Sequence, residues 1–281
     1  MDVGIGLPAT IPGVSGQQII EWARRAEGRG FSTLGTIDRV VYGNDEPLVT
    51  LAAAAAVTGT IKLATTVLLA PLRANAALLA KQAASVDHIS NGRLVLGIAV
   101  GGREDDYDVS GVDFHTRGRR FNEQLETFAR VWSGEAGVGP APPRGRPAVL
   151  IGGQADAAFR RAARHGDGWI MGGGAPDQFR EGKAKLEAAW EDAGRDGAPR
   201  TASLAYFALG DGAEQAADSY LHDYYGFLGE IADMIASSAA TDAETVRGYV
   251  AGFTEAGCDE LILFPCSPDP GQVDLLADAL A

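Results

Sequence analysis

Basic residues are scarce in this chain of 281 residues, which has 24 Lys and Arg against 37 Asp and Glu and a formal net charge of −13. Nucleic acids and anionic membrane surfaces are bound mainly through clustered Lys and Arg. The acidic balance therefore predicts no nucleic-acid partner and no membrane partner. The N-terminal residues also lack a basic segment followed by an apolar one, and no apolar run approaches 20 residues. We therefore expect a cytoplasmic protein.

Cysteine and histidine are also rare. The two cysteines, Cys258 and Cys266, flank a short apolar run. If that run is a strand, roughly 26 Å separate them, at about 3.3 Å per residue. A disulfide cannot bridge this distance, so we expect two free thiols in a reducing compartment. The four histidines lie at positions 88, 115, 165 and 222, without the spacing of a metal site, so no metal is predicted.

Eight short apolar runs alternate with segments of helical pattern along the whole chain. The runs show no polar alternation, which is typical of parallel strands buried on both faces. They cover residues 3–7, 33–37, 62–69, 94–100, 148–151, 168–171, 202–209 and 260–264. Eight such units predict one domain over residues 1–281, an α/β protein with a (β/α)8 TIM barrel. The alternative is an open doubly wound sheet, which would need a G-x-G-x-x-G motif after the first strand. Pro8 follows that strand instead.

Helices are expected over residues 17–29, 47–56, 75–88, 118–132 and 176–193, and in segments that end at 165 and 280. Residues 213–256 are expected to form two or three helices. Residues 104–116 are expected to form a long loop. The Gly- and Pro-rich segment 134–147 is typical of a surface connection.

The fourth strand leads into the most informative stretch of the sequence. Gly101 and Gly102 follow it directly, and Arg103 opens a run of charged residues. In barrels of this type ligands bind at the carboxyl ends of the strands. Glycine allows the backbone to approach a ligand closely, so this exit is a candidate binding site. The alternative is an ordinary solvent-exposed strand end.

Glycine clusters also follow the fifth and sixth strands. Gly152, Gly153 and Gln154 follow the fifth strand, and Gly172 and Gly173 follow the sixth. A helix is expected after each cluster. Backbone N–H groups at such a turn, next to a helix N-terminus, bind phosphate without basic side chains. Two neighbouring phosphate-binding turns are therefore expected, with two plain tight turns as the alternative.

Other polar and aromatic residues allow two interpretations each. Asp38 and Arg39, at the end of the second strand, are either ligand-binding residues or an ion pair that seals the barrel rim. His115 lies in the segment after the fourth strand and is either a substrate contact or a solvated side chain. An aromatic group after the seventh strand either covers a pocket or packs between helices. It comprises Tyr220, Tyr224, Tyr225 and Phe227.

In four segments the sequence resembles the bacterial luciferase-like oxidoreductases, which use FMN or the deazaflavin F420. The segments are NGRLVLGIAVGGREDDYDVSGVDF (91–114), LATTVLLAPLR (63–73), VLIGGQADAAFRRAARHGDGWIMGG (149–173) and DELILFP (259–265). The resemblance implies a TIM barrel that binds reduced F420 or FMN, and a non-proline cis peptide at Thr66–Val67 against the ring. The cofactor-binding positions that it implies are Thr36, Asp38, Thr66, Val67, Gly101, Gly102, Arg103, Gly152, Gly153, Gln154, Gly172 and Gly173.

One position departs from the family pattern. Many members have an acid followed by a histidine that handles protons, and here the acid is Asp38 and the next residue is Arg39. Arginine stays protonated and cannot act as a general base at pH 7. Either His115, a tyrosine or the substrate moves protons, or the chain binds a flavin without turnover. Arg39 is also a candidate to hold an anionic oxygen of substrate or cofactor.

The resemblance implies an oxidoreductase that acts on a small organic substrate. It is either a luciferase-like monooxygenase or an F420H2-dependent reductase. The alternatives are a catalytically silent flavin-binding protein of the same fold and a metal-dependent hydrolase, which the dispersed histidines disfavour. FMN and F420 share the part from ring to phosphate, and F420 adds an acidic glutamyl tail. That tail would require a local basic rim, for which the candidates are Arg103, Arg117, Arg119 and Arg120. We expect a homodimer, and a separate flavin or F420 reductase is a candidate partner.

Overall fold

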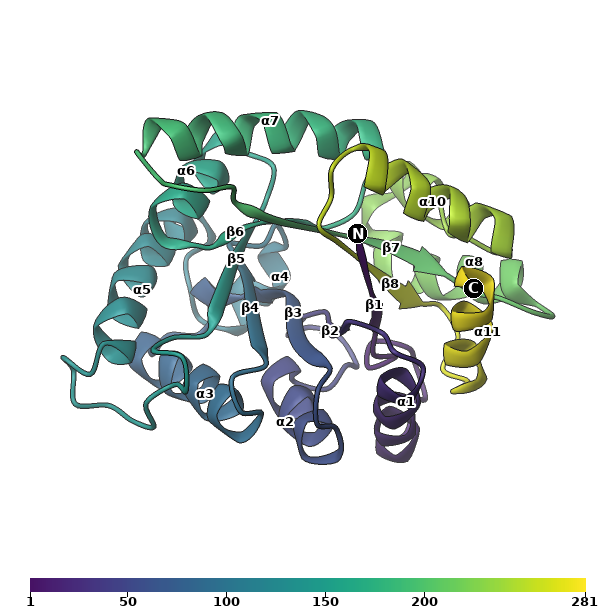
Figure 1. The fold of residues 1–281 in the computed structure, drawn as a ribbon, viewed down its shortest axis with the longest axis horizontal. Coiled ribbons are helices and arrows are strands. Elements are labelled where there is room, and N and C mark those ends of the chain that lie inside the picture. The colour runs from purple at the N-terminus through teal and green to yellow at the C-terminus, as the bar shows by residue number, and fades with distance from the viewer.

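The computed structural model describes residues 1–281 and shows eight parallel strands closed into a barrel, paired in the order β1 to β8 with β8 back on β1. The predicted barrel is confirmed, and the open-sheet alternative is wrong. Figure 1 shows the helices arranged in a ring around the strands. The strands are β1 (Asp2–Gly6), β2 (Thr33–Thr36), β3 (Lys62–Leu69), β4 (Leu94–Ala99), β5 (Ala148–Gly152), β6 (Gly168–Met171), β7 (Arg200–Phe207) and β8 (Glu260–Pro265).

The helices that follow the first four strands are α1 (Gly16–Gly28), α2 (Pro47–Val57), η1 (Ala70–Leu72), α3 (Ala76–Ile89), α4 (Glu104–Val109), η2 (Phe114–Thr116) and α5 (Arg117–Trp132). Those that follow the last four are α6 (Asp156–His165), α7 (Pro176–Asp192), α8 (Ala213–Tyr225), η3 (Gly226–Leu228), α9 (Glu230–Ser237), α10 (Ala243–Glu255) and α11 (Gly271–Leu280). Their starts follow local chemistry. Ser15 forms a capping box with Gln18 before α1, and the Asn75 side chain caps α3.

The prediction of a plain loop over residues 104–116 was wrong, because α4 and η2 lie within it. Glu104, Asp105 and Asp106 occupy the first turn of α4, where carboxylates interact favourably with the helix dipole. Tyr107 is fully buried and anchors this helix, and its hydroxyl donates to the carbonyl of Val100. The charged run after β4 is therefore ordered structure.

Two apolar layers hold the barrel together. A cluster of 53 buried residues packs between strands and helices, and a second cluster of 18 includes the barrel interior. Phe264 fills much of that interior, since a Cβ placed on Gly6 would lie 2.2 Å from its ring. The glycines within β1 therefore make room for a core side chain and do not form a nucleotide-binding turn.

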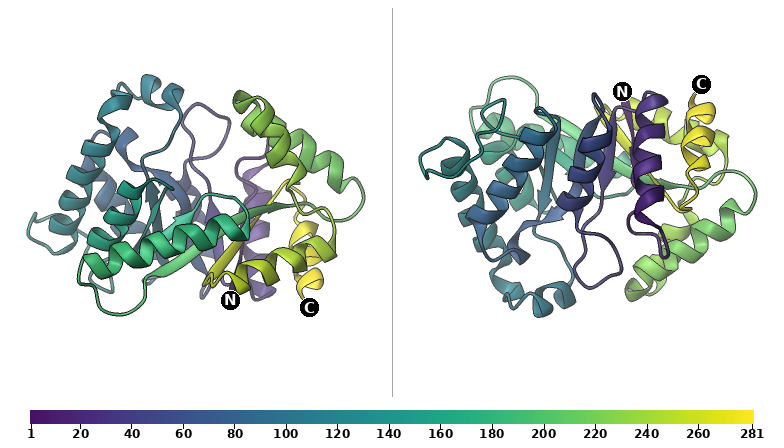
Figure 2. Two further views of the ribbon diagram at one scale, coloured as in Figure 1. Left: turned by 90° about the horizontal axis from the view of Figure 1, so that it is seen from above. Right: turned by 90° about the horizontal axis from the view of Figure 1, so that it is seen from below.

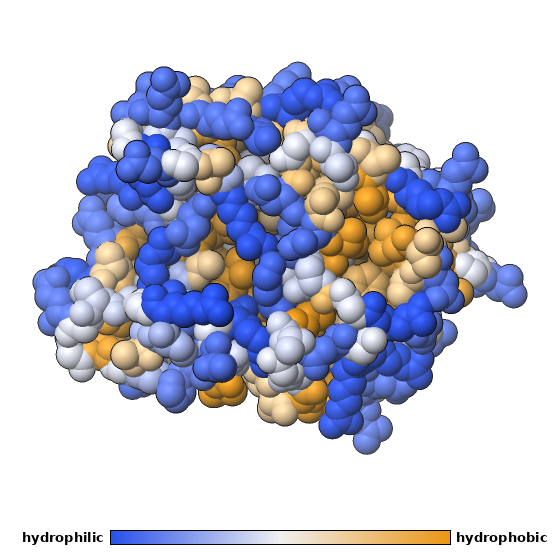
Figure 3. All heavy atoms as spheres, viewed as in Figure 1, coloured by the Kyte–Doolittle hydropathy of each residue, from blue (hydrophilic) through white to orange (hydrophobic).

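Figure 2 shows α4 and the segment from α8 to α9 projecting at the end of the barrel opposite the N-terminus. On the face seen in Figure 3, hydrophilic residues cover the periphery and hydrophobic residues gather around β7 and β8. Cys258 and Cys266 are free and buried, and burial raises the pKa of the Cys258 thiol to about 12. No helix combines the length and the apolar character needed to cross a bilayer.

Candidate functional site

The glycine turns after β5 and β6 lie side by side. Gly152 pairs with Ile170 in the sheet, which places the two strand ends next to each other. The backbone N–H groups of residues 153, 154, 172 and 173 find no acceptor within the chain. Gly153 and Gly173 adopt φ angles of +120° and +104°, which other residues rarely adopt. Because α6 and α7 begin just beyond, these turns have the donor set that a phosphate group requires.

The Thr66–Val67 peptide bond is cis, as the resemblance implied. It lies where the pairing of β3 with β4 shifts register, between Thr65 and Leu68. Thr66 Oγ1 donates to the carbonyl oxygen of Thr36 over 3.0 Å, which ties the peptide to the end of β2. A Cβ on Gly152 would come within 3.0 Å of Val67 Cγ1. The cis peptide and the β5 turn therefore face each other at the same end of the barrel.

Asp38 is buried and belongs to an ion pair at the barrel rim. One carboxylate oxygen accepts from the Leu69 amide and from Arg73 Nη1, each over 2.7 Å. Arg73 also reaches Glu46 over 2.9 Å. These contacts fasten the end of β2 to the end of β3. The predicted ion pair between Asp38 and Arg39 is therefore wrong: Asp38 closes the rim through Arg73, because the Arg39 guanidinium is paired with two other carboxylates.

Arg39 is also buried, and its two carboxylate partners lie in α4. Its Nε donates to Asp106 over 2.8 Å and its Nη2 to Asp105 over 2.9 Å. The second oxygen of Asp106 accepts from the amides of Val40 and Val41. The Asp106 side chain is fully buried, whereas that of Asp105 is 52% exposed. Its Nη2 also donates to the carbonyl oxygen of Val41 over 3.1 Å, and the predicted role of Arg39 in holding an anion stays a prediction. No proton-transferring group occupies this position.

Arg103 extends from the β4 exit to α8. Its Nη2 donates to the Tyr224 carbonyl oxygen over 3.0 Å, and its guanidinium lies 3.6 Å from the centre of the Phe227 ring. Tyr42, in the loop after β2, donates to Asp223 of α8. Gly101 has a φ of +74°, and Gly102 is exposed. The segment after β7 is therefore joined to the loops after β2 and β4.

The tyrosines of the predicted aromatic group pack in the 18-residue cluster that includes the barrel interior, or against it, whereas Phe227 is exposed. The hydroxyls of Tyr206 and Tyr225 are 2.7 Å apart, and Tyr220 is hydrogen-bonded to Thr10 over 2.5 Å. Burial raises the pKa of Tyr206 and Tyr220 well above the ordinary value for a phenol. These phenols therefore stay neutral at pH 7 and can donate hydrogen bonds. Tyr206 was not among the residues named from sequence.

His115 lies in η2 with an exposed side chain, and its ring packs against Phe114 at 5.9 Å. No hydrogen bond or ion pair joins its ring to Asp38 or Arg39, which sit in two separate ion-pair systems. Asp38, Arg39 and His115, the candidates for catalytic roles, are therefore not gathered into one cluster, and their roles stay predictions. Sequence reasoning missed Asp106, the buried partner of Arg39. The only signal was the acidic run after Gly102.

No group of three His, Cys, Asp or Glu side chains is placed to hold a metal ion. The fold and the site define a class: a parallel (β/α)8 barrel with unpaired backbone donors at two neighbouring strand ends. The sequence profile of the luciferase-like monooxygenase family matches residues 1–273. The chain belongs to this family, whose structural neighbours include F420-dependent enzymes and flavin monooxygenases.

Three individual proteins share at most about one third of their aligned residues with this chain. An uncharacterised protein of Mycobacterium tuberculosis is 33% identical over 211 residues, 63% of this chain and 72% of the relative. An F420-dependent glucose-6-phosphate dehydrogenase of Amycolatopsis mediterranei is 26% identical over 192 residues, 60% of this chain and 57% of the relative. An F420-dependent secondary alcohol dehydrogenase has a similar structure, with a TM-score of 0.84 at 18% identity over 99% of this chain and 97% of that one. This last likeness shows the fold alone.

Proposed function

We propose that the protein is an F420H2-dependent oxidoreductase that reduces a carbonyl or unsaturated group of a small organic substrate. The observation that carries this proposal is the pair of neighbouring glycine turns with free backbone donors, set opposite the cis peptide. The sequence relative that depends on F420 supports the choice of deazaflavin over FMN. The protein would orient the cofactor and shield it from water.

The residues fit a phosphorylated flavin-type cofactor. The amides of the turns at Gly152–Gly153 and Gly172–Gly173 would hold its phosphate, since they are free backbone donors. Thr66 and Val67 would support the ring, and the exit at Gly101 would lie alongside it. When bound, the reduced cofactor supplies the hydride. The chain's own task is then to bind, to orient and to deliver a proton.

We propose that a tyrosine delivers this proton. Arg39 cannot do so, and His115 is exposed and apart from the rim residues. The hydroxyls of Tyr206 and Tyr225 form a hydrogen-bonded pair, and burial keeps both pKa values above the ordinary range. A neutral phenol at pH 7 is a suitable hydrogen-bond donor to a developing alkoxide.

The test is a pair of titrations, with F420 and with FMN, each followed by quenching of cofactor fluorescence. We expect tight binding of F420 and weaker binding of FMN. Variant Gly173→Val should weaken both, because its backbone needs a positive φ that valine disfavours. Variant Gly248→Val, on the outer helix α10, is the control. Failure of the wild-type protein to bind either cofactor would refute the proposal.

An FMN-dependent monooxygenase is the second candidate, because the matching family is described as luciferase-like monooxygenases. Tight binding of FMN alone, with substrate-dependent consumption of oxygen, would favour it. The silent flavin-binding protein is a third candidate, which Arg39 in place of the histidine supports. Cofactor binding without oxidation of any substrate in a broad panel would favour that reading.

We further propose that the chain acts in the cytoplasm as a homodimer. For a monooxygenase or a reductase of this kind, a separate flavin or F420 reductase would supply the reduced cofactor. The homodimer and the reductase partner come from the family resemblance, and the cytoplasmic location comes from the sequence. Sedimentation of the purified protein tests the first, and copurification with a reductase tests the second.

A further inference from the structure

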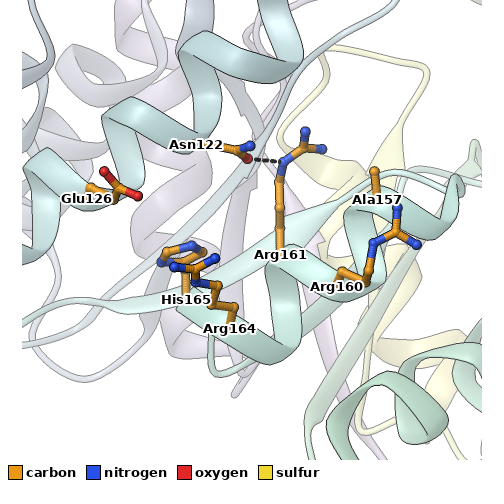
Figure 4. A pocket seen from close by; sticks show the side chains of 7 residues that line it. All are labelled: Asn122, Glu126, Ala157, Arg160, Arg161, Arg164 and His165. Carbon is orange, nitrogen blue, oxygen red and sulfur yellow. Dashed lines mark hydrogen bonds between the residues drawn. The ribbon is translucent and has the colours of Figure 1, made fainter. Parts of the chain in front are cut away.

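A groove of about 510 Å³ runs between α5 and α6 on the outer wall of the barrel. Figure 4 shows its side chains, with Asn122 and Glu126 on α5 and four basic residues on α6. The lining residues are Asn122, Glu126, Ala157, Arg160, Arg161, Arg164 and His165. The groove therefore gathers positive charge on a protein whose net charge is −13.

None of the three arginines forms an ion pair with a carboxylate. Arg161 Nε donates to Asn122 over 2.7 Å and its Nη2 to the Gly118 carbonyl over 3.1 Å, and both acceptors are neutral. Glu126 is the only acid in the lining. Burial, and then the neighbouring Arg160, lower the pKa of Arg161. Burial, and then Arg164, lower the pKa of His165. The groove thus holds a surplus of positive charge.

The groove begins beside the proposed phosphate site. Ala157 lies in the first turn of α6, three residues after Gln154 of the glycine turn. Arg160 lies about one turn farther along α6. Arg164 lies seven residues beyond Ala157, which is about 10 Å along a helix that rises 1.5 Å per residue. The guanidiniums therefore lead from the glycine turn down the outer wall.

We propose that this groove binds the acidic glutamyl tail of F420, an inference that rests on the proposed function. The tail continues from the cofactor's phosphate, so it would leave the glycine turn at the head of the groove. Its carboxylates match guanidinium groups that lack a carboxylate partner in the protein. FMN has no such tail, so the groove distinguishes the two cofactors although they share the phosphate site.

The experiment measures the Kd of F420 with its full tail and of F420 from which the glutamates have been removed, by fluorescence quenching at low ionic strength. The proteins are the wild type, the double variant Arg160→Gln/Arg164→Gln, and the control Arg24→Gln, which removes an exposed arginine of α1. We expect the double variant to bind full-length F420 about fivefold more weakly, since it loses two exposed charge contacts. Binding of tail-free F420 and the behaviour of the control should not change.

Added salt gives a second measurement on the wild-type protein. Binding of full-length F420 should weaken more steeply with salt than binding of the tail-free form. If the double variant and the wild type bind full-length F420 equally, the groove does not hold the tail, and the proposed function stands. If the wild type binds no form of F420, both the inference and the proposed function fail. If the double variant weakens both forms equally, the arginines act on the phosphate site instead.

Discussion

At the scale of single residues, Arg39 shows how a change from the family's histidine creates a new set of ion pairs at the barrel rim. Arg39 occupies a position where many family members carry a histidine, and its guanidinium is taken up by two carboxylates of α4. The sequence identified Arg39 as unusual but could not reveal its partners, because Asp105 and Asp106 lie more than 60 residues away. A short acidic run gives no sign of which carboxylate will be buried.

Substituting Asp106→Ala should destabilise the protein by about 3 kcal/mol, because the buried Arg39 would keep only the half-exposed Asp105 as a carboxylate partner. The amides of Val40 and Val41 would also lose their acceptor. Equilibrium unfolding in urea measures the change. Asp105→Ala, at the exposed partner, is the matched control and should cost less than 1 kcal/mol. Equal effects of the two variants would contradict this account.

Glu27 makes stability depend on pH. Its carboxylate accepts from the amides of Gly59, Thr60 and Ile61, and these bonds outweigh burial and lower its pKa to about 2 from 4.5. A depressed pKa in the folded state stabilises the protein above about pH 4.5, and this contribution is lost as the pH falls toward 2. Glu27→Gln should cost about 1 kcal/mol at pH 7 and less at pH 3, measured by urea unfolding. A difference that does not change with pH would contradict this.

At the scale of elements, β3 and β4 approach each other unusually closely beside the cis peptide. A Cβ on Gly97 of β4 would lie 2.1 Å from the carbonyl oxygen of Thr65. The sequence predicted both strands, because each is a continuous apolar run. It could not predict their separation, which depends on a glycine that the pattern treats as one more buried residue.

Gly97→Ala should therefore destabilise the protein by about 3 kcal/mol, because the added methyl group would push against backbone that cannot rotate away. Gly248→Ala in α10 is the control: nothing lies within 4 Å of its added Cβ, and alanine is the better helix former. It should leave stability unchanged or raise it by up to about 1 kcal/mol. Thermal unfolding of both variants tests the pair, and a harmless Gly97→Ala would show that the strands can separate.

The groove between α5 and α6 could not be predicted from the sequence of either helix. The run of basic residues in α6 looks like an ordinary solvated helix face. Only the packing of α6 against α5 shows that its arginines share one hollow and lack carboxylate partners. The glycine turns, in contrast, were predictable, because glycine pairs that follow buried strands and precede helices carry a local signal.

At the scale of the whole molecule, binding of the cofactor should be visible as stability. A ligand that binds only the folded state at 100 times its Kd adds about 2.7 kcal/mol. For a chain of 281 residues, this corresponds to an increase in Tm of about 5 °C. Thermal scans with F420, with FMN and without ligand measure it. An unchanged Tm at saturating concentrations of both would count against the cofactor site.

The order and pairing of all eight strands could be predicted, since alternating apolar runs and helical patterns leave few topologies.

The pairing of β1 with β8, with Asp2 opposite Glu260, closes the sheet into a barrel. Every strand has two neighbours, so the sheet has no free edge on which another polypeptide could add a strand. A second copy of this chain can therefore associate only through helices and loops, and substitutions on those outer surfaces, not in the sheet, are the ones that would separate the copies.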